Sequence, residues 1–125
     1  MAGHSIPFDA DSTVDYFALG LQCGLFSVAE KDGNVVGFII GISAPCMVNR
    51  NYKIGAELAW WVDPQYRHGG DAIRLVKHIE QKAKEAGCAL WSMMCLEAIE
   101  PDKVEKMYLH LGYEKGERTF TRRLN

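Results

Sequence analysis

The sequence lacks the features that would place a protein in a membrane, on nucleic acid or around a metal ion. Its longest apolar stretch, residues 35–48, is interrupted by two glycines and a proline and is shorter than the roughly 20 residues that a membrane helix needs. The four cysteines show no Cys-x-x-Cys spacing and the four histidines are scattered, so no zinc site is predicted. A formal net charge of −2 gives no basic field for nucleic acid. We therefore expect no metal, no membrane and no nucleic-acid partner.

Other absences concern the compartment and the number of domains. Residues 1–11 contain no charged leader followed by an apolar stretch and a cleavage site, which predicts a cytoplasmic protein. The cysteines stand among apolar neighbours, which predicts buried, reduced thiols at Cys23, Cys46, Cys88 and Cys95. A chain of 125 residues can bury one core but cannot also hold a separate substrate domain. Residues 1–125 are therefore predicted to form a single domain.

Hydrophobic periodicity and turn residues predict a chain in which helices and strands alternate. The predicted helices are 9–22, with Asp11 or Ser12 as its N-cap, an amphipathic helix after Gly70 that ends at Gly87, and 102–111. The predicted strands are 25–30, 35–43, 52–62, 89–96 and a closing strand or hairpin at 113–124, with a loop at 44–51. An Asp-Gly pair predicts an antiparallel hairpin between the first two strands, whereas strands joined by a crossover helix lie parallel. The prediction is thus an α/β fold with a mixed sheet.

The most informative segment is the corner between a strand and a helix at residues 62–73. Backbone N–H groups in the first turn of a helix lack intrahelical partners and carry the positive end of the macrodipole, so they can bind phosphate. Gly69 and Gly70 leave these groups unobstructed, Arg67 adds a fixed cation, and Pro64 ends the strand. The corner therefore predicts a phosphate cradle for a nucleotide-like cofactor.

This corner resembles the coenzyme A loop of the Gcn5-related N-acetyltransferase (GNAT) family. The family pattern Arg/Gln-x-x-Gly-x-Gly/Ala is met by Arg67, Gly70 and Ala72. A second similarity lies in residues 107–114, Met-Tyr-Leu-His-Leu-Gly-Tyr-Glu, which match the family's Leu-Tyr-x-x-x-Gly-Phe/Tyr. With the strand at 56–62, the resemblance covers roughly residues 25–124. The shortened amino-terminal region also resembles that of small acetyltransferases encoded by bacteriophages.

The resemblance implies a GNAT-like, mixed but largely antiparallel sheet that is flanked by helices and in which parallel strands four and five splay apart. In this family the pantetheine arm of acetyl-coenzyme A lies in the gap and pairs with the main chain of the fourth strand. The usual first strand and much of the first helical pair are missing or shortened here. The cofactor-binding residues that the resemblance implies are Trp61, Val62, Arg67, His68, Gly69, Gly70, Asp71 and Ala72.

The resemblance also implies direct transfer of an acetyl group to an amine in a ternary complex. Tyr108 matches the family tyrosine near the cofactor sulfur, from which a phenol could protonate the leaving thiolate; spacing alone is equally consistent with a buried aromatic. Glu57 is the candidate base, directly or through water, and the alternative is a structural carboxylate. Strand alternation predicts that Glu57 shares a face with Ala59 and Trp61. A backbone N–H near Trp61 would face the thioester oxygen.

Three positions depart from the family pattern. His68 replaces a frequent glycine, Pro101 replaces a frequent asparagine, and Asp71 stands at an aliphatic position, where we expect its side chain to face outward. These departures favour an alternative: a non-catalytic coenzyme A-binding or protein-interaction module. Retention of Tyr108 and Glu57 favours the enzyme. A generic phosphate-loop nucleotide binder is disfavoured because the corner contains no Gly-Lys-Ser/Thr.

The partners of the protein are less constrained by the sequence. The acceptor could be a protein amine or a small molecule, because a fold can serve many acceptors. An exposed carboxy-terminal strand could also pair with its copy across a dimer axis. The resemblance therefore identifies a cofactor, acetyl-coenzyme A, but no particular acceptor.

Overall fold

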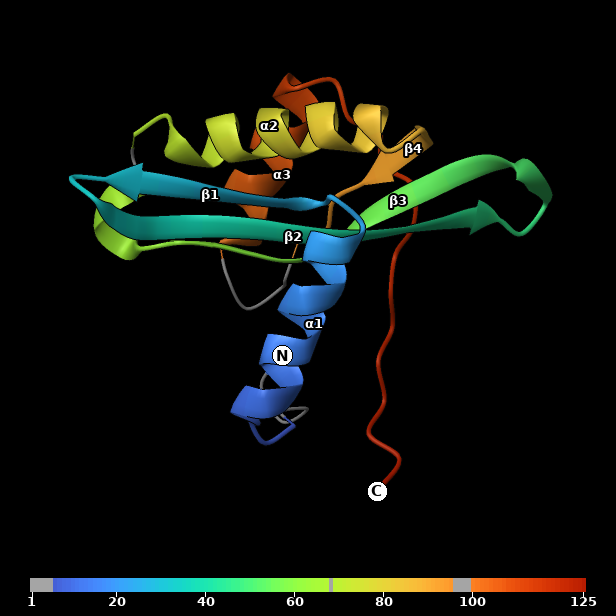
Figure 1. The fold of residues 1–125 in the computed structure, drawn as a ribbon, viewed down its shortest axis with the longest axis horizontal. Helices are drawn as coiled ribbons and strands as arrows, with labels where there is room; N and C mark the ends of the chain where they lie inside the picture. Colours follow the sequence, from blue (N-terminus) through green and yellow to red (C-terminus); the bar gives the residue numbers. More distant parts are fainter. Residues whose placement is uncertain (1–5, 68, 96–99) are drawn as a thin grey trace. The chain divides into compact units, whose positions relative to one another are not determined.

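A computed structural model of the chain describes residues 6–67, 69–95 and 100–125 (Figure 1). Its elements in chain order are α1 (Ala10–Gln22), β1 (Phe26–Lys31), β2 (Asn34–Cys46), β3 (Asn49–Val62), a 3-10 turn (Pro64–Tyr66), α2 (Asp71–Glu85), β4 (Cys88–Ser92) and α3 (Pro101–His110). The chain divides into two compact units. Residues 10–92, which we call the sheet unit, contain everything except α3, and α3 lies in the carboxy-terminal unit, residues 93–125 with 6–9.

The four strands form one mixed sheet in the order β1-β2-β3-β4. The β1–β2 and β2–β3 pairs are antiparallel, and β3 and β4, which are joined through α2, are parallel. Asp32 and Gly33 connect β1 and β2 with φ angles of 51° and 81°, as a type I′ turn requires. The predicted α/β class, mixed sheet and first hairpin are therefore confirmed.

The two helices of the sheet unit cover opposite faces of the sheet. Phe17 of α1 packs against Phe26 and Phe38, which lie on one face. A side chain at Gly37, the neighbour of Phe38, would point the other way and meet Leu75 of α2. Because successive strand residues alternate between faces, α1 and α2 must bind to different sides, as Figure 1 shows. The most completely buried side chains lie at these contacts: Leu25, Ile39, Ile40, Val76 and Ile79.

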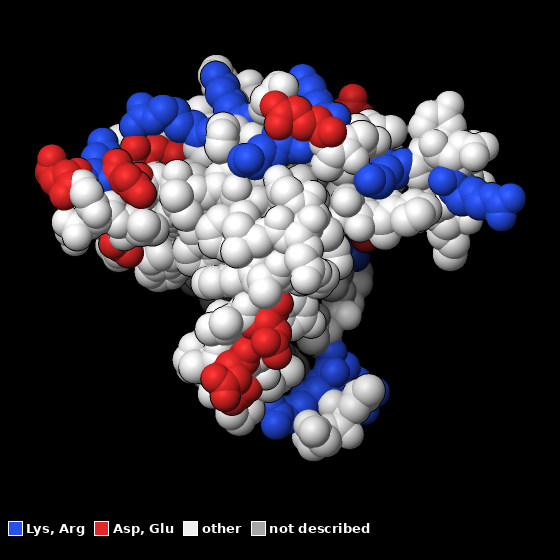
Figure 2. Space-filling view, viewed as in Figure 1, with Lys and Arg blue, Asp and Glu red and all other residues white. Residues whose placement is uncertain are grey.

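Helix α2 has the amphipathic character that its sequence predicts. Val76, Ile79 and Ala83 are buried, and the outward side carries lysine and arginine side chains, which are visible along the upper part of Figure 2. Gly87 follows the helix with φ of 87° and donates its N–H to the carbonyl of Lys84 at 3.0 Å. A glycine is favoured there because the left-handed conformation costs it no steric clash.

The hairpin between β2 and β3 is longer than predicted. Residues 44–51 were expected to form a loop, but β2 continues to Cys46 and β3 begins at Asn49. Pro45 pairs with Lys53 just before a register shift. A proline can remain in a strand at such an irregularity because no ladder N–H is needed there. The turn residues in this segment therefore did not interrupt the pairing.

The carboxy-terminal end differs from the prediction more strongly. Residues 113–124 were expected to form a strand or hairpin, but they contain neither helix nor strand. Phe120 and Leu124 are 89% and 92% exposed. A sequence pattern typical of strands is not enough to form one, because the backbone groups of a strand need a pairing partner. This segment is also rich in charge and contains Gly116, and both features disfavour a strand. The argument for a homodimer through a carboxy-terminal strand therefore loses its basis.

Two smaller predictions were also wrong. Helix α1 begins at Ala10, so Asp11 and Ser12 lie inside its first turn and not at the N-cap. Neither does the structure bury the thiols: three cysteines are half-buried, Cys95 is exposed, and all four are free. The reason is that Cys46 ends the projecting hairpin and Cys88 begins an edge strand, where apolar sequence neighbours provide little cover.

In the carboxy-terminal unit, α3 begins at Pro101, close to the predicted start. Proline suits a first helical position because that N–H has no intrahelical partner. Leu111 ends the helix, and Gly112 follows with φ of 95°. The N–H of Tyr113 then donates to the carbonyl of Tyr108 at 3.0 Å, which turns the chain back along the helix.

Candidate active site

The site begins where the pairing between β3 and β4 stops. β4 pairs with residues 53–56 of β3, and β3 then continues to Val62 without β4 beside it. Within the described part of the sheet unit, residues 57–62 thus have a partner strand on the β2 side only. An edge of this kind presents backbone N–H and C=O groups that an extended ligand can pair with. Its position fits the gap that the resemblance implies.

The hydrogen bonds between β2 and β3 show which backbone groups of β3 face the open edge. The N–H of Asp63 donates to the carbonyl of Val36 at 2.8 Å. Because residues in an antiparallel pair alternate between facing the partner strand and facing away, Trp61 is directed towards β2 and Val62 towards the open edge. The carbonyl of Val62 accepts a hydrogen bond from Nε of Arg67 at 2.6 Å. The amide expected near Trp61 is therefore the N–H of Val62.

Arg67 is fixed by a contact that the sequence did not reveal. Its guanidinium carbon lies 4.4 Å from the centroid of the Trp61 ring, and the indole N–H of Trp61 donates to Oδ1 of Asp63 at 3.0 Å. A cation above an indole face is attracted by the ring quadrupole. The 3-10 turn at Pro64–Tyr66 brings the two residues together, and no sequence pattern predicts this pairing.

The two glycines of the loop differ in their surroundings, and only the space beside Gly69 is open. A Cβ on Gly69 would have no atom closer than 3.9 Å, so the space beside it is open. Gly70 immediately precedes α2, which begins at Asp71, and Ala72 is half-buried in the first turn. These residues thus stand at the N-terminus of α2, where the resemblance predicts a phosphate contact. The predicted contact of His68 lies outside the described residues.

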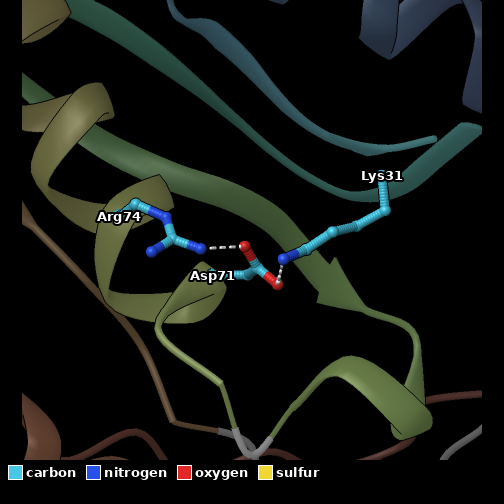
Figure 3. Close-up of polar contacts among 3 residues, drawn as sticks. All are labelled: Lys31, Asp71 and Arg74. Atoms are coloured by element: carbon cyan, nitrogen blue, oxygen red, sulfur yellow. Dashed lines mark hydrogen bonds and ion pairs between the residues drawn. The ribbon is translucent and has the colours of Figure 1, made fainter. Parts of the chain in front are cut away.

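Asp71 does not face solvent, contrary to expectation. Its side chain is only 7% exposed and lies between two cations, Lys31 from the end of β1 and Arg74 from the next helical turn (Figure 3). Lys31 Nζ is 3.5 Å from Oδ2, and Arg74 donates a hydrogen bond to Oδ1. That bond lowers the pKa of the Asp71 carboxyl below its usual value, against the opposing effect of burial, and Lys31 lowers it further. These two cations explain how a carboxylate can be buried beside a phosphate cradle.

Glu57 lies on a different face from the one predicted. Ala59 pairs with Ile40 and Glu57 pairs with Gly41, so Leu58 is an extra residue, a β-bulge. Because Ile40 and Gly41 are neighbours on β2, they point to opposite faces, and so do their partners. Glu57 is therefore separated from Ala59 and Trp61 by the sheet.

The surroundings of Glu57 are set by β4. A Cβ at Gly41, the cross-strand partner of Glu57, would lie 2.3 Å from a ring atom of Trp91, and the same ring covers Gly55. Paired strand residues point to the same face, so Glu57 lies on the side of the sheet that Trp91 covers. Its side chain is buried. The candidate base thus lies on the strand that forms the open edge, before the bulge.

Tyr108 belongs to the carboxy-terminal unit and is buried in the structure. Its phenol donates a hydrogen bond to the carbonyl of Met94 at 2.8 Å. Its ring lies 5.6 Å, centroid to centroid, from the tilted ring of Tyr113. The two residues of the Tyr-x-x-x-Gly-Tyr pattern are thus in contact, and the phenol proton is held by a main-chain oxygen.

The described residues contain no group of three or more His, Cys, Asp or Glu side chains that could hold a metal ion. Among the same residues, no helix is long and apolar enough to span a membrane. The charged side chains at the loop include Arg67, Arg74 and the buried carboxylate of Asp71.

Comparison with known proteins identifies the family. A sequence profile of the "Acetyltransferase (GNAT) family" matches residues 4–113. An acetyltransferase of Yersinia pestis (strain Pestoides F) is 33% identical over 90 residues, which is 72% of this chain and 57% of that protein. An acetyltransferase of Yersinia pseudotuberculosis serotype I (strain IP32953) gives the same values. The chain belongs to the GNAT family of acetyltransferases, and it matches just over half the length of these curated relatives.

Solved structures agree with this assignment at the level of the fold. AAC(6')-Iy in complex with the bisubstrate analog CoA-S-monomethyl-acetylneamine has a TM-score of 0.73 and 22% identity, covering 99% of this chain and 83% of that one. A transcriptional regulator from Bacillus halodurans C-125 has a TM-score of 0.74 and 20% identity, covering 91% and 76%. Identities this low show a shared fold and leave the chemistry to be argued from the site.

Proposed function

We propose that the protein transfers an acetyl group from acetyl-coenzyme A directly to an amine acceptor. The observation that carries this proposal is the position of the loop beside the open edge of β3. Arg67 is anchored on Val62 and Trp61, and the space beside Gly69 is open. A phosphate cradle at the end of an unpaired edge suits a cofactor that has a diphosphate at one end and an extended, amide-containing arm.

Acetyl transfer to an amine needs correct approach, a neutral amine, stabilisation of the developing oxyanion and a proton for the departing thiolate. We assign the oxyanion contact to the N–H of Val62, because the strand directs this group towards the open edge. We assign Tyr108 as the acid. Its phenol already donates a hydrogen bond, to the carbonyl of Met94, and rotation about the C–O bond would redirect the proton.

Glu57 is proposed as the base that removes the amine proton, directly or through a water molecule. Burial favours this role because it shields the carboxylate from bulk water. The bulge at Leu58 makes direct contact with an acceptor on the Trp61 side harder, since the carboxylate is on the other face. Transfer through water therefore suits the geometry better than direct contact.

The acceptor is proposed only as a class, an amine on a small molecule or a protein. Structures with a similar fold include an aminoglycoside acetyltransferase from a soil metagenomic sample and a ribosomal-protein-alanine N-acetyltransferase from Brucella melitensis. Their names describe very different acceptors, and their identities of 18% and 23% support the fold alone. The proposal rests on the cofactor side of the site.

One observation favours the alternative, a coenzyme A-binding or interaction module without turnover. The hydrogen bond from Tyr108 to Met94 connects α3 to the segment before it, which is a structural role for the proposed acid. Binding of the cofactor is common to the enzyme and to a coenzyme A-binding module, whereas release of thiol in the presence of an amine occurs only in the enzyme, and a pure interaction module would do neither.

The test is calorimetric titration of the whole chain with acetyl-coenzyme A, coenzyme A and ATP. We expect micromolar binding of both coenzyme A forms and no binding of ATP, because the corner contains no Gly-Lys-Ser/Thr to hold a nucleotide triphosphate with magnesium. Absence of coenzyme A binding would overturn the proposal. Binding without thiol release, across a panel of amines, would select the non-catalytic module.

A further inference from the structure

The backbone conformation of Gly70 does not require a glycine, but the space next to it is limited by Arg74. Its φ of −80° and ψ of 4° are accessible to any residue. A Cβ at this position would lie 3.0 Å from Nη1 and 3.6 Å from Cζ of Arg74. The missing side chain therefore leaves room for the Arg74 guanidinium directly above the loop.

Arg74 lies in a place where a cation is unfavourable without an anion. It is the fourth residue of α2, near the end of the helix that carries the positive partial charge. Asp71 offsets part of this cost by accepting a hydrogen bond from Nη2 (Figure 3). Nη1 lies beside the position that a Cβ on Gly70 would occupy. Among the residues that the structure describes, Asp71 is the partner that holds the guanidinium, and it does so through Nη2.

The charge of this cluster is not balanced. Lys31 and Arg74 contribute one positive charge each and Asp71 contributes one negative charge, which leaves the three side chains with one positive charge. The carboxylate is 7% exposed, whereas the Arg74 side chain is 66% exposed. The negative group is therefore buried beneath the cluster, and the uncompensated positive charge is turned to solvent beside the cradle.

We propose that Arg74 is a second phosphate-binding cation of the loop, which adds to Arg67, and that Asp71 is the positioning residue that holds Arg74 over Gly70. This inference rests on the proposed function, because the ligand is the phosphate chemistry of coenzyme A. That chemistry has two sources, the diphosphate and the phosphate on the ribose. A guanidinium suits both because its planar donors can bind two phosphate oxygens at once.

The test compares the affinity of coenzyme A and dephospho-coenzyme A for the whole chain and for Arg74→Gln by calorimetry. The matched control is Lys84→Gln, which removes the same charge from the last turn of α2, roughly 15 Å further along the helix axis. We expect Arg74→Gln to raise the Kd for coenzyme A about tenfold or more, and to flatten the dependence of Kd on salt. The control should change Kd by less than about twofold.

The pattern across ligands identifies the source of the phosphate. Weakened binding of both ligands assigns Arg74 to the diphosphate, and weakened binding of coenzyme A alone assigns it to the ribose phosphate. An unchanged Kd for both ligands overturns the inference while the proposed function stands, because the wild-type chain still binds. Failure of the wild-type chain to bind coenzyme A instead overturns the proposed function itself.

Arg74→Lys provides a second variant in which the charge is kept and the planar fork is lost. We expect a Kd between those of the wild type and Arg74→Gln, and a thermal unfolding midpoint close to that of the wild type. A Kd for Arg74→Lys as weak as that for Arg74→Gln, with a lowered midpoint in both variants, would show that Arg74 supports the loop structurally, and the phosphate contact would be rejected.

Discussion

Tyr108 combines a proposed chemical role with an observed structural one. Its phenol donates a hydrogen bond to the carbonyl of Met94, and its ring packs against Tyr113. The same hydroxyl would have to supply a proton to the thiolate during turnover. The two roles predict different consequences for loss of the hydroxyl group, so a single substitution can separate them.

Tyr108→Phe should lower kcat by about 10²-fold or more if the phenol is the acid, with little change in the Kd for acetyl-coenzyme A. Loss of the hydrogen bond to Met94 should lower the free energy of unfolding by about 1 kcal/mol in the same variant. Thiol-release kinetics and urea denaturation measure the two effects. A less stable variant with an unaltered kcat would leave Tyr108 with its structural role only.

The pKa of Asp71 makes a second prediction, on stability. The folded-state pKa lies below the ordinary value of about 3.9, so the Asp71 ion pairs contribute their full stability at neutral pH. This contribution declines as the pH falls below that ordinary value and is lost as the pH falls through the folded-state pKa. The difference in unfolding free energy between the wild type and Asp71→Asn should therefore be largest at pH 7 and shrink below about pH 4.

Urea denaturation of both chains across this pH range measures the difference. Asp102→Asn, in which the substituted residue is exposed on the first turn of α3, controls for the general effect of removing a carboxylate. A difference for Asp71→Asn that stays constant into the acid range would show that the ion pairs with Lys31 and Arg74 do not stabilise the fold.

At the scale of residues, a short local pattern could propose members of the cradle but not their contacts. Arg67, Gly70 and Ala72 were proposed in this way, and their role in binding stays a prediction. The pairing of Asp71 with Lys31 joins residues that are far apart in the chain and brought together by the first hairpin. A pattern within one segment cannot contain that information.

At the scale of elements, the contact between α1 and the sheet depends on one small residue. A Cβ at Gly20 would lie 2.2 Å from Cγ1 and 2.5 Å from Cδ1 of Ile40, and 3.3 Å from the carbonyl of Leu25. A glycine in the interior of a helix normally costs stability. It is present here because the helix and β2 approach too closely for any side chain.

Gly20→Ala should therefore lower the free energy of unfolding by about 1–2 kcal/mol, because overpacking costs about 1–3 kcal/mol and the better helix propensity of alanine returns less than that. Gly116→Ala is the matched control, since a Cβ there would meet nothing within 4 Å. Urea denaturation followed by circular dichroism measures both. A Gly20→Ala variant as stable as the wild type would show that Ile40 can rotate away without cost.

The elements were predicted where local signals are strong. The Asp-Gly turn and the capped amphipathic helix α2 agree with the structure because φ angles and helical periodicity are local properties. The extension of the second hairpin and the strand expected at 113–124 were wrong, because pairing between strands decides such segments. The bulge at Leu58 was also missed, and with it the face of Glu57.

At the scale of the whole molecule, the proposed direct transfer requires both substrates to be bound together. Initial velocities of thiol release, measured at several fixed concentrations of an active amine, should give double-reciprocal lines that intersect. Parallel lines, together with an acetylated protein in mass spectrometry when acetyl-coenzyme A is added alone, would instead indicate a covalent intermediate. A mixture without amine is the control for slow hydrolysis of the thioester.

The family could be predicted from the sequence because two of its motifs occur in the right order. The acceptor could not, because the fold accommodates many acceptors. The chemistry of the acceptor side therefore has to come from experiment.

The extra residue in β3 has a consequence for how this strand tolerates change. In a strand without a bulge, odd-numbered residues point to one face of the sheet and even-numbered residues to the other, and this phase is constant along the strand. The extra residue Leu58 reverses the phase, so odd-numbered residues before it and after it point to opposite faces. Loss of Leu58 would restore a single phase and leave both halves on their present faces, because Glu57 and Ala59 would then be neighbours in the chain and would still point to opposite sides. At this point in the chain, the sheet can lose one residue without changing which side chains it buries.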